Sequence, residues 1–336
     1  MHVQARRTSR ALAAVGAVLA IFAGHGRAEA QTAVGSFERT LTVTGPVDLD
    51  VQSGSGRIEV RSGQAGRIEI SARVTAGDWG NWGFFGGRLS PQERVRRIET
   101  NPPVEQTGNR VRIGRIDDEQ LRNVSISYTL VVPADTTLVS KTGSGSHVIE
   151  GLRGAITVSS GSGSIRVRDA GGDVRASTGS GSILADMVGG SFFASSGSGS
   201  IDGVSVKGGV TVKSGSGGID VSQSGAGPVE ASSGSGSIHL TGLRGGLRAS
   251  TSSGTLRVQG EQTSDWRLST SSGSVTIELA GKPAFALDAH SNSGRIDTQY
   301  PLTVTGLIDR RELRGSVNGG GPLLHVRTSS GGIRIR

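Results

Sequence analysis

A six-residue motif that returns at a fixed spacing is the feature that most constrains this chain. Ser-Gly-Ser-Gly-Ser-Ile ends at Ile165 and recurs, with small changes, up to Ile238. Between His147 and Val275 the ends of successive copies lie 18 or 19 residues apart. Self-similarity at a short fixed period is the signature of a solenoid, in which each repeat forms one coil. The copies end at His147, Ile165, Ile183, Ile201, Ile219, Ile238, Leu256, Val275, Ile296 and Ile333.

A second apolar residue precedes the end of each later copy by nine positions. Each of the two positions begins a run in which apolar and polar residues alternate, as in Ile165-Arg166-Val167-Arg168, and this alternation predicts a strand with one face buried. The glycines suit tight turns, and a serine hydroxyl can bond the backbone of its own or the adjacent coil. The sequence therefore predicts an all-β, single-stranded parallel β-solenoid (β-helix) with about 18 residues and two strands per coil. The second positions are Ile156, Val174, Phe192, Val210, Val229, Leu247, Trp266, Leu287 and Leu324.

This register predicts which side chains face the core and which face water. Inward positions should be buried, and the residues that follow them should be exposed. The expected buried set is Ile165, Val167, Val174, Ala176, Ile183, Ile201, Ile219, Ile238 and Val275, and the expected exposed set is Arg166, Arg175, Asp202, Asp220 and His239.

The region before the regular repeats carries the same pattern with an interruption. Residues 47–60 already follow the repeat, so the solenoid is expected to start near Val47. Residues 77–103 then form a short insert near the N-terminus that is rich in aromatic residues and ends in a helix from Pro91 to about Glu99, with Ser90 as its N-cap. Val95 and Ile98 should dock this helix, while Glu93, Arg94, Arg96 and Arg97 remain in water.

The first 30 residues have the form of a cleavable signal peptide. Three arginines precede an apolar stretch from Ala11 to Gly24, which is too short to span a bilayer, and Ala28-Glu29-Ala30 offers a cleavage site. Removing these residues lowers the net charge from +8 to +5. The predicted organisation is a signal peptide at 1–30, a β-rich N-terminal segment at 31–140 and solenoid repeats at 141–336, with no transmembrane segment in the mature chain.

The repeats and the segments around them resemble the bacterial DUF4097 family. The resemblance rests on the Ser-Gly-Ser-Gly-Ser-Ile copies, on the stretch from Ser127 to Asp135 and on the C-terminal stretches 317–322 and 328–333. It implies an adhesin-like β-strand-repeat protein of the cell envelope, and the family supplies no established catalytic residues. Many relatives have aspartate before the last apolar residue of the motif, whereas this chain has serine, glycine, arginine or threonine there.

The residue types that support catalysis or metal binding are sparse and scattered. Cysteine is absent, and the histidines after residue 30 are His147, His239, His290 and His325, with no metal-ligand spacing. His147 occupies an inward position and is expected to be a core histidine bonded to the backbone. No lysine follows the Gly-Ser runs at the spacing of a phosphate-binding loop, and the turns lack the aspartate of calcium-binding repeats. No catalytic residue, metal site or cofactor is predicted, and no nucleic-acid motif accompanies the positive charge.

Two groups of residues are candidates for a binding surface. Outward arginines form basic stripes along the strand faces if they stack; they include Arg267, Arg327, Arg334 and Arg336 beyond the set selected here. The aromatic insert either covers an end or flank of the solenoid or forms an exposed binding tip. The selected candidates are Trp79, Trp82, Phe84, Phe85, Arg166, Arg168, Arg175, Arg248 and Arg257.

The resulting functional hypothesis is an exported, non-enzymatic protein that binds at the cell envelope. Its expected partner is an envelope polysaccharide or another envelope protein, and its location is the periplasm, the outer surface or the medium. Two alternatives remain open: a periplasmic scaffold without a dedicated ligand, and a carbohydrate-active enzyme built on a β-helix.

Overall fold

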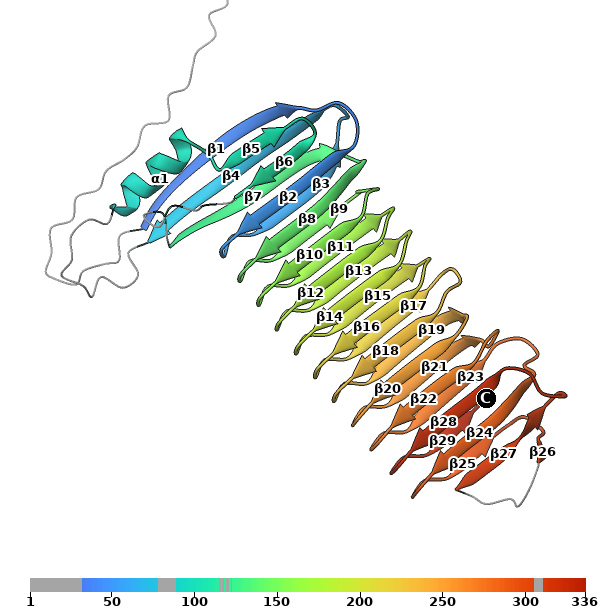
Figure 1. The fold of residues 1–336 in the computed structure, drawn as a ribbon. Helices are drawn as coiled ribbons and strands as arrows, with labels where there is room; N and C mark the ends of the chain where they lie inside the picture. The colour runs from blue at the N-terminus through green and yellow to red at the C-terminus, as the bar shows by residue number, and fades with distance from the viewer. Residues whose placement is uncertain are drawn as a thin grey trace, which may run out of the picture. The chain divides into compact units, whose positions relative to one another are not determined.

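A computed structural model describes residues 32–77, 89–114, 116, 118, 121, 123–304 and 311–336. The predicted signal peptide at residues 1–30 lies outside the described residues. Apart from one helix, the described part of the chain folds into two long sheets, called sheet A and sheet B here (Figure 1).

Both sheets are built mainly from parallel strands. Sheet A has 14 strands: β1 (Thr32–Thr42), β3 (Ile58–Gly63), β4 (Arg67–Gly77), β7 (Val124–Pro133), β9 (His147–Glu150), β11 (Ile165–Ala170), β13 (Ile183–Val188), β15 (Ile201–Val206), β17 (Ile219–Gln223), β19 (Ile238–Arg244), β21 (Leu256–Glu261), β23 (Val275–Leu279), β25 (Ile296–Thr298) and β29 (Ile333–Ile335). Sheet B has 15: β2 (Val47–Ser53), β5 (Val104–Thr107), β6 (Arg110–Ile113), β8 (Thr136–Thr142), β10 (Ile156–Ser160), β12 (Val174–Thr178), β14 (Phe192–Ser196), β16 (Val210–Ser214), β18 (Val229–Ser233), β20 (Leu247–Thr251), β22 (Trp266–Thr270), β24 (Phe285–Ser291), β26 (Thr303–Val304), β27 (Glu312–Val317) and β28 (Leu323–Thr328).

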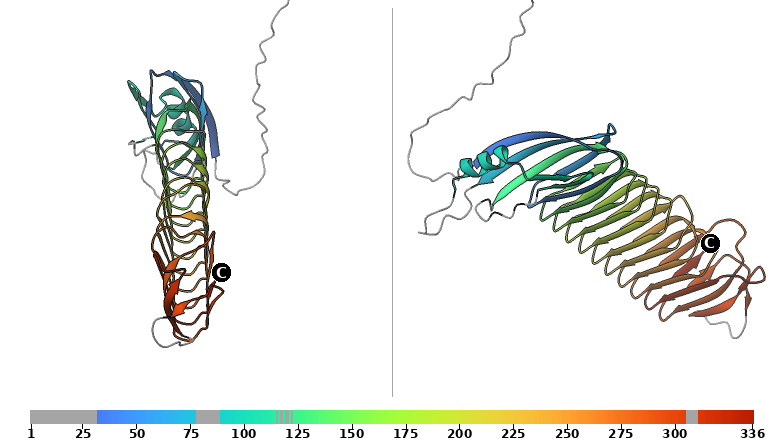
Figure 2. Two further views of the ribbon diagram at one scale, coloured as in Figure 1. Left: turned by 90° about the vertical axis from the view of Figure 1, so that its right-hand side faces the viewer. Right: turned by 45° about the horizontal axis from the view of Figure 1, so that its top comes forward.

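Each coil contributes one strand to each sheet. The chain runs along a sheet B strand, turns through the Ser-Gly motif, returns along a sheet A strand and turns again into the next coil (Figure 2). In-register partners in the regular part are 18 or 19 residues apart, for example Ile183 beside Ile201 and Ile219 beside Ile238. The predicted all-β architecture with parallel strands in long sheets is confirmed.

The core lies between the two sheets and follows the predicted alternation. All nine side chains expected inside are buried, and so are all nine second apolar positions. Arg166, Arg175, Asp220 and His239 are exposed as expected, but Asp202 is only half-buried. The Asp202 carboxylate accepts a hydrogen bond from the Ser200 hydroxyl at 3.4 Å, and burial raises the pKa of Asp202, with a smaller contribution from Asp220.

A buried hydroxyl at the end of ten sheet B strands, namely β8, β10, β12, β14, β16, β18, β20, β22, β24 and β28, links successive coils. The Ser160 hydroxyl accepts a hydrogen bond from the Gly163 N–H at 2.8 Å and donates one to the Gly145 carbonyl of the preceding coil at 3.0 Å. The same pair of bonds recurs from coil to coil, so the first serine or threonine of each motif bonds its own and the adjacent coil as expected. We call these residues the hydroxyl ladder: Thr142, Ser160, Thr178, Ser196, Ser214, Ser233, Thr251, Thr270, Ser291 and Thr328.

The second glycine of the motif is required by the distance between coils. A Cβ atom added to Gly163 would overlap the carbonyl oxygen of Gly145 directly beneath it, and Gly199 meets Gly181 in the same way. Because a side chain has no space there, only glycine lets the turns stack at the separation that the strand hydrogen bonds impose.

Coil order in space differs from coil order in sequence at both ends of the solenoid. β2 and β3 lie between β6–β7 on one side and β8–β9 on the other. At the other end, β28–β29 insert between β22–β23 and β24–β25. The hydrogen bonds of the hydroxyl ladder follow the same order: the Thr328 hydroxyl donates to the Gly273 carbonyl, and the Ser291 hydroxyl donates to the Gly331 carbonyl. Antiparallel strands complete both ends, β1, β4 and β5 at one and β26–β27 at the other.

The helix α1 (Pro91–Thr100) begins where its sequence predicts. Ser90 and Glu93 form a reciprocal capping box, and the Ser90 hydrogen bonds hold the pKa of Glu93 below its usual value. Val95 and Ile98 are buried as expected, with Val95 against Gly35 of β1. The expectation that Arg94 stays in water is wrong: this side chain is buried beside Val95 and donates a hydrogen bond to the Gly77 carbonyl at 3.2 Å.

Candidate functional site

Outward side chains of successive coils stack into rows, because the parallel strands pair in register. The first outward row of sheet A is Val148, Arg166, Leu184, Asp202, Asp220, His239, Arg257, Thr276 and Arg334. The first outward row of sheet B is Val139, Thr157, Arg175, Phe193, Thr211, Glu230, Arg248, Arg267 and His325. Each sheet therefore presents a regular series of side chains, one per coil.

The structure divides the predicted surface residues among several places. Trp79, Trp82, Phe84 and Phe85 lie outside the described residues. Arg166, Arg168 and Arg257 belong to sheet A, whereas Arg175 and Arg248 belong to sheet B. The five arginines therefore do not share one face.

Most of these arginines have neutral or acidic neighbours in their row. Arg166 lies between Val148 and Leu184. The Arg175 guanidinium lies over the Phe193 ring, 4.5 Å from its centroid, and within 4.0 Å of the Asp173 carboxylate. The arginines consequently do not continue along either sheet as an unbroken basic stripe.

One stretch of sheet B does bring basic side chains together. Arg248, Arg267 and His325 are in-register neighbours on β20, β22 and β28, and Arg327 follows two residues after His325 on the same outward face. We call these four residues the sheet B basic patch. The alternation predicts that the three arginines face outward, whereas the placement of His325 and Arg327 beside β22 was not predicted. The insertion of β28 beside β22 joins positions 58 residues apart, and no local sequence signal marks it.

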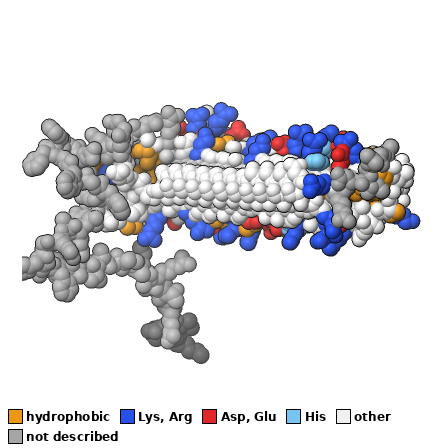
Figure 3. All heavy atoms as spheres, turned by 90° about the horizontal axis from the view of Figure 1, so that it is seen from below, with side chains coloured by type: hydrophobic (Ala, Val, Ile, Leu, Met, Phe, Trp, Pro, Cys, Tyr) orange, Lys and Arg blue, Asp and Glu red, His pale blue; other side chains and the backbone are white. Residues whose placement is uncertain are grey.

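Nine of the turns that follow sheet B strands form an uncharged edge. Stacked turns at 143–146, 161–164, 179–182, 197–200, 215–218, 234–237, 252–255, 271–274 and 329–332 contain only glycine, serine and threonine. The second residue of each of these turns is an exposed serine, such as Ser162 and Ser198. Figure 3 shows this pale edge with Lys, Arg, Asp and Glu side chains along both sides.

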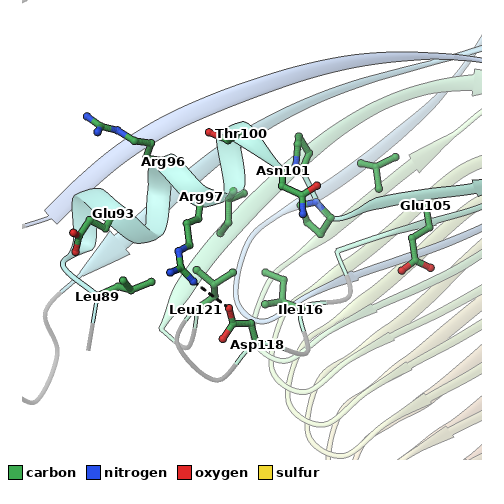
Figure 4. Close-up of a pocket in the computed structure, with 14 residues that line it drawn as sticks. Leu89, Glu93, Arg96, Arg97, Thr100, Asn101, Glu105, Ile116, Asp118 and Leu121 are labelled. Atoms are coloured by element: carbon green, nitrogen blue, oxygen red, sulfur yellow. Dashed lines mark ion pairs between the residues drawn. The ribbon is translucent and has the colours of Figure 1, made fainter. Parts of the chain in front are cut away.

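An open hollow of about 840 Å³ lies beside α1 (Figure 4). Its lining combines apolar side chains such as Leu89, Ile116 and Leu121 with charged residues of the helix. Arg97 forms an ion pair with Asp118 across it, with 3.6 Å between nitrogen and oxygen. The hollow thus offers a mixed apolar and charged surface, and its described lining residues include no set of converging catalytic groups.

His147 is a core residue, as the alternation predicts. Its Nδ1 lies 3.0 Å from the Ser140 hydroxyl and its Nε2 lies 3.2 Å from the Ser159 carbonyl. Since a carbonyl can only accept, Nε2 carries the proton and Nδ1 accepts from Ser140. Burial lowers the pKa of His147 to about 4, against a smaller opposing effect of the Ser159 hydrogen bond, so the ring is neutral at pH 7.

The other described histidines each contact one polar partner. His239 lies 3.2 Å from Asp220, His325 lies 3.0 Å from Asp288, and His290 lies 2.8 Å from the Asn292 side chain. Within the described ranges, no three His, Asp or Glu side chains are grouped as a metal site would require. None of the helical structure described there is long and apolar enough to cross a membrane.

The fold and its surface define a class of protein: a two-sheet parallel β-solenoid whose outward side chains stack in rows. The Toastrack DUF4097 family model matches residues 129–336, and the chain belongs to this family. The predicted family is therefore confirmed.

Two solved structures are similar to this chain. One is a candidate adhesin from Bacteroides fragilis, 12% identical, with a TM-score of 0.36 over 90% of this chain and 97% of the other. The second is a candidate cell adhesion protein from Clostridium sporogenes, 10% identical, with a TM-score of 0.24 over 90% of this chain and 99% of the other. No curated protein matches the sequence.

Proposed function

We propose that this protein is an exported, non-enzymatic, adhesin-like protein that binds at the cell envelope through the outward rows of its solenoid. The observation that carries the proposal is the in-register stacking of outward side chains over successive coils. A surface that repeats at the strand spacing can contact a long partner at many points, so that weak individual contacts add up. The DUF4097 resemblance implies the same class.

The signal-like segment at residues 1–30 supports export, and a protein with this segment should be found outside the cytoplasm. Fractionation of cells that produce the full chain, with N-terminal sequencing of the product, tests this point. A mature product beginning near Gln31 in the periplasm, on the surface or in the medium is expected. An uncleaved cytoplasmic product would contradict it.

Binding is tested with purified protein and isolated cell envelopes. We expect saturable cosedimentation with the envelopes, because the solenoid rows offer many contact points, one per coil. If the protein does not sediment with envelopes, but its loss alters envelope integrity, the scaffold alternative is favoured. Release of sugars from a panel of glycans by the purified protein would favour the carbohydrate-active enzyme.

The aromatic segment needs its own test, because Trp79, Trp82, Phe84 and Phe85 lie outside the described residues. We propose that this segment covers the body of the protein, with at least one tryptophan mostly buried. The Trp79→Ala/Trp82→Ala variant should then melt at a lower temperature than the parent. An unchanged melting temperature with lost envelope binding would instead make the segment a binding tip.

A further inference from the structure

We propose that the sheet B basic patch is a binding site for an acidic polysaccharide, a polyhydroxylated chain bearing carboxylate or sulfate groups. This inference rests on the proposed function and names the kind of envelope partner for one face of the solenoid.

The patch owes its charge to three consecutive strands. Because neighbouring strands lie about 4.8 Å apart, Arg248, Arg267 and His325 form a short row with close spacing. Arg327 extends this row sideways, two residues along β28. All three arginines are exposed, and His325 is half-buried.

The nearby carboxylates are already occupied. The Asp265 carboxylate accepts the Leu323 N–H at 2.9 Å through one oxygen and pairs with Arg267 at 3.3 Å through the other. Both Asp288 oxygens are used as well, one by His325 at 3.0 Å and the other by Arg314 at 3.3 Å.

Two cations of the patch are left for a ligand. Among the residues that the structure describes, Arg248 and Arg327 have no ion pair. The in-register acidic neighbour of Arg248 is Glu230, which lies 3.6 Å from Lys213 instead. These two guanidinium groups therefore remain available for anionic groups, which they can bind in bidentate geometry.

The side chains between the arginines favour a sugar polymer over other polyanions. Ser250 and Ser269 are the second outward residues of β20 and β22, in register with each other and with Arg327. They leave shallow space beside the arginines and offer hydroxyls for hydrogen bonds. The four residues of the sheet B basic patch and these two serines include no Trp, Tyr or Phe to stack on bases and no aliphatic side chain to enter a lipid surface. The geometry thus combines separated cations with neutral hydrogen-bonding groups.

The test compares two variants of the full chain that lose the same charge. Arg248→Gln/Arg327→Gln removes the two free cations of the patch, and Arg153→Gln/Lys207→Gln removes two exposed cations from the turns between coils, outside the outward rows. Binding to immobilised alginate, dextran sulfate and neutral dextran is measured at two salt concentrations, with melting temperatures to verify folding. Alginate and dextran sulfate distinguish carboxylate from sulfate as the recognised group.

We expect the parent to bind at least one of the two anionic polymers, with an affinity that falls as the salt concentration rises, and not to bind neutral dextran. The patch variant should lose about tenfold in affinity, because it loses two charge-assisted contacts with the polymer, while the turn variant should stay within about twofold of the parent. Equal losses in both variants, no binding of either polymer, or equally strong patch-dependent binding of single-stranded DNA would overturn the assignment.

These outcomes are separable from the proposed function. A parent that cosediments with envelopes but binds no anionic polymer contradicts the patch assignment and leaves the envelope-binding role standing. A parent that binds alginate through the patch but not envelopes contradicts the envelope-binding role and supports the patch chemistry.

Discussion

At the residue scale, the hydroxyl ladder joins the turn of one coil to the turn of the next. Each ladder hydroxyl satisfies one N–H of its own turn and one carbonyl of the neighbouring coil, as Ser196 does with Gly199 at 2.8 Å and Gly181 at 2.9 Å. Both backbone groups lose their partner when the hydroxyl is removed, and an unsatisfied buried polar group is costly.

The Ser196→Ala variant should therefore lower the free energy of unfolding by about 1–3 kcal/mol, measured by urea denaturation. Ser198→Ala is the matched control, because it makes the same substitution two residues later at an exposed position and should change stability by less than about 0.5 kcal/mol. Ser196→Thr should be tolerated, because threonine occupies the same position at Thr178 and Thr251. Equal effects of the two alanine variants would contradict the ladder.

The buried pair His147 and Ser140 replaces two aliphatic residues of the regular core. In register, His147 stands beside Ile58 and Ile165, and Ser140 stands beside Val51 and Val158. The two polar side chains satisfy each other at 3.0 Å, so the coil tolerates them together. Each alone would leave a buried polar group without its partner.

This pair should make stability depend on pH. The pKa of His147 falls from 6.5 to about 4 on folding, so between these values the unfolded chain binds a proton that the folded chain excludes. The free energy of unfolding should therefore decrease as the pH drops from 6.5 to 4, by about 3 kcal/mol in total. The double variant His147→Ile/Ser140→Val should show a smaller decrease over that range in denaturation curves, and a slope equal to that of the parent would refute this explanation.

At the element scale, the coil is the unit of stability. A sheet B strand, its turn and a sheet A strand bury only a few aliphatic side chains, so a coil depends on its neighbours above and below. Ile201 lies between Ile183 and Ile219 in the stack and is fully buried. Loss of its side chain should consequently destabilise adjacent coils more than distant ones.

Ile201→Ala should cost about 2–5 kcal/mol in free energy of unfolding, as for other buried aliphatic truncations. Hydrogen exchange should increase mainly in β13, β15 and β17. Leu184→Ala removes a similar side chain from an outward position and should cost less than about 1 kcal/mol. Uniform loss of protection over the whole solenoid would show that the coils do not act as local units.

At the scale of the whole described unit, the coils at both ends of the stack are not in sequence order. Strands that are distant in the sequence therefore pair with each other there. The last coil, β28–β29, is inserted between two coils that precede it in the chain. Its residues Leu324, Val326, Ile333 and Ile335 are buried, and it supplies the pairing partners of β22 and β24. The final strands are therefore internal to the sheets and cannot fray independently.

Deletion of residues 323–336 should disrupt coils that lie earlier in the sequence. β24 and β25 lose their parallel partners, so hydrogen exchange across 285–298 should rise sharply and the melting temperature should fall. Exposed strand edges should also promote self-association. In a solenoid stacked in sequence order, 285–298 would remain packed on β22–β23. Unchanged protection there would therefore contradict the inserted arrangement.

Local pattern was sufficient for most of the coil architecture. Alternation of Ile165, Arg166 and Val167 fixes which side chain enters the core, because strand side chains alternate by geometry. The Ser-Gly turns were readable for the same reason: their backbone requirements fall within a few residues. The helix at Pro91–Thr100 was also predictable, since a capping box is a local signal. These features depend on short-range sterics and hydrogen bonds that the residues themselves determine.

Tertiary structure alone decided the order of the coils at the ends and, with it, the basic patch. The copies ending at Ile296 and Ile333 have similar motifs, so sequence similarity cannot tell which of them stacks on Val275. Pairing of β22 with β28 joins segments that are distant in the sequence, and it brings His325 and Arg327 to Arg267. Each residue's inward or outward direction is a local property, whereas its neighbours in the next coil depend on the order in which the coils stack.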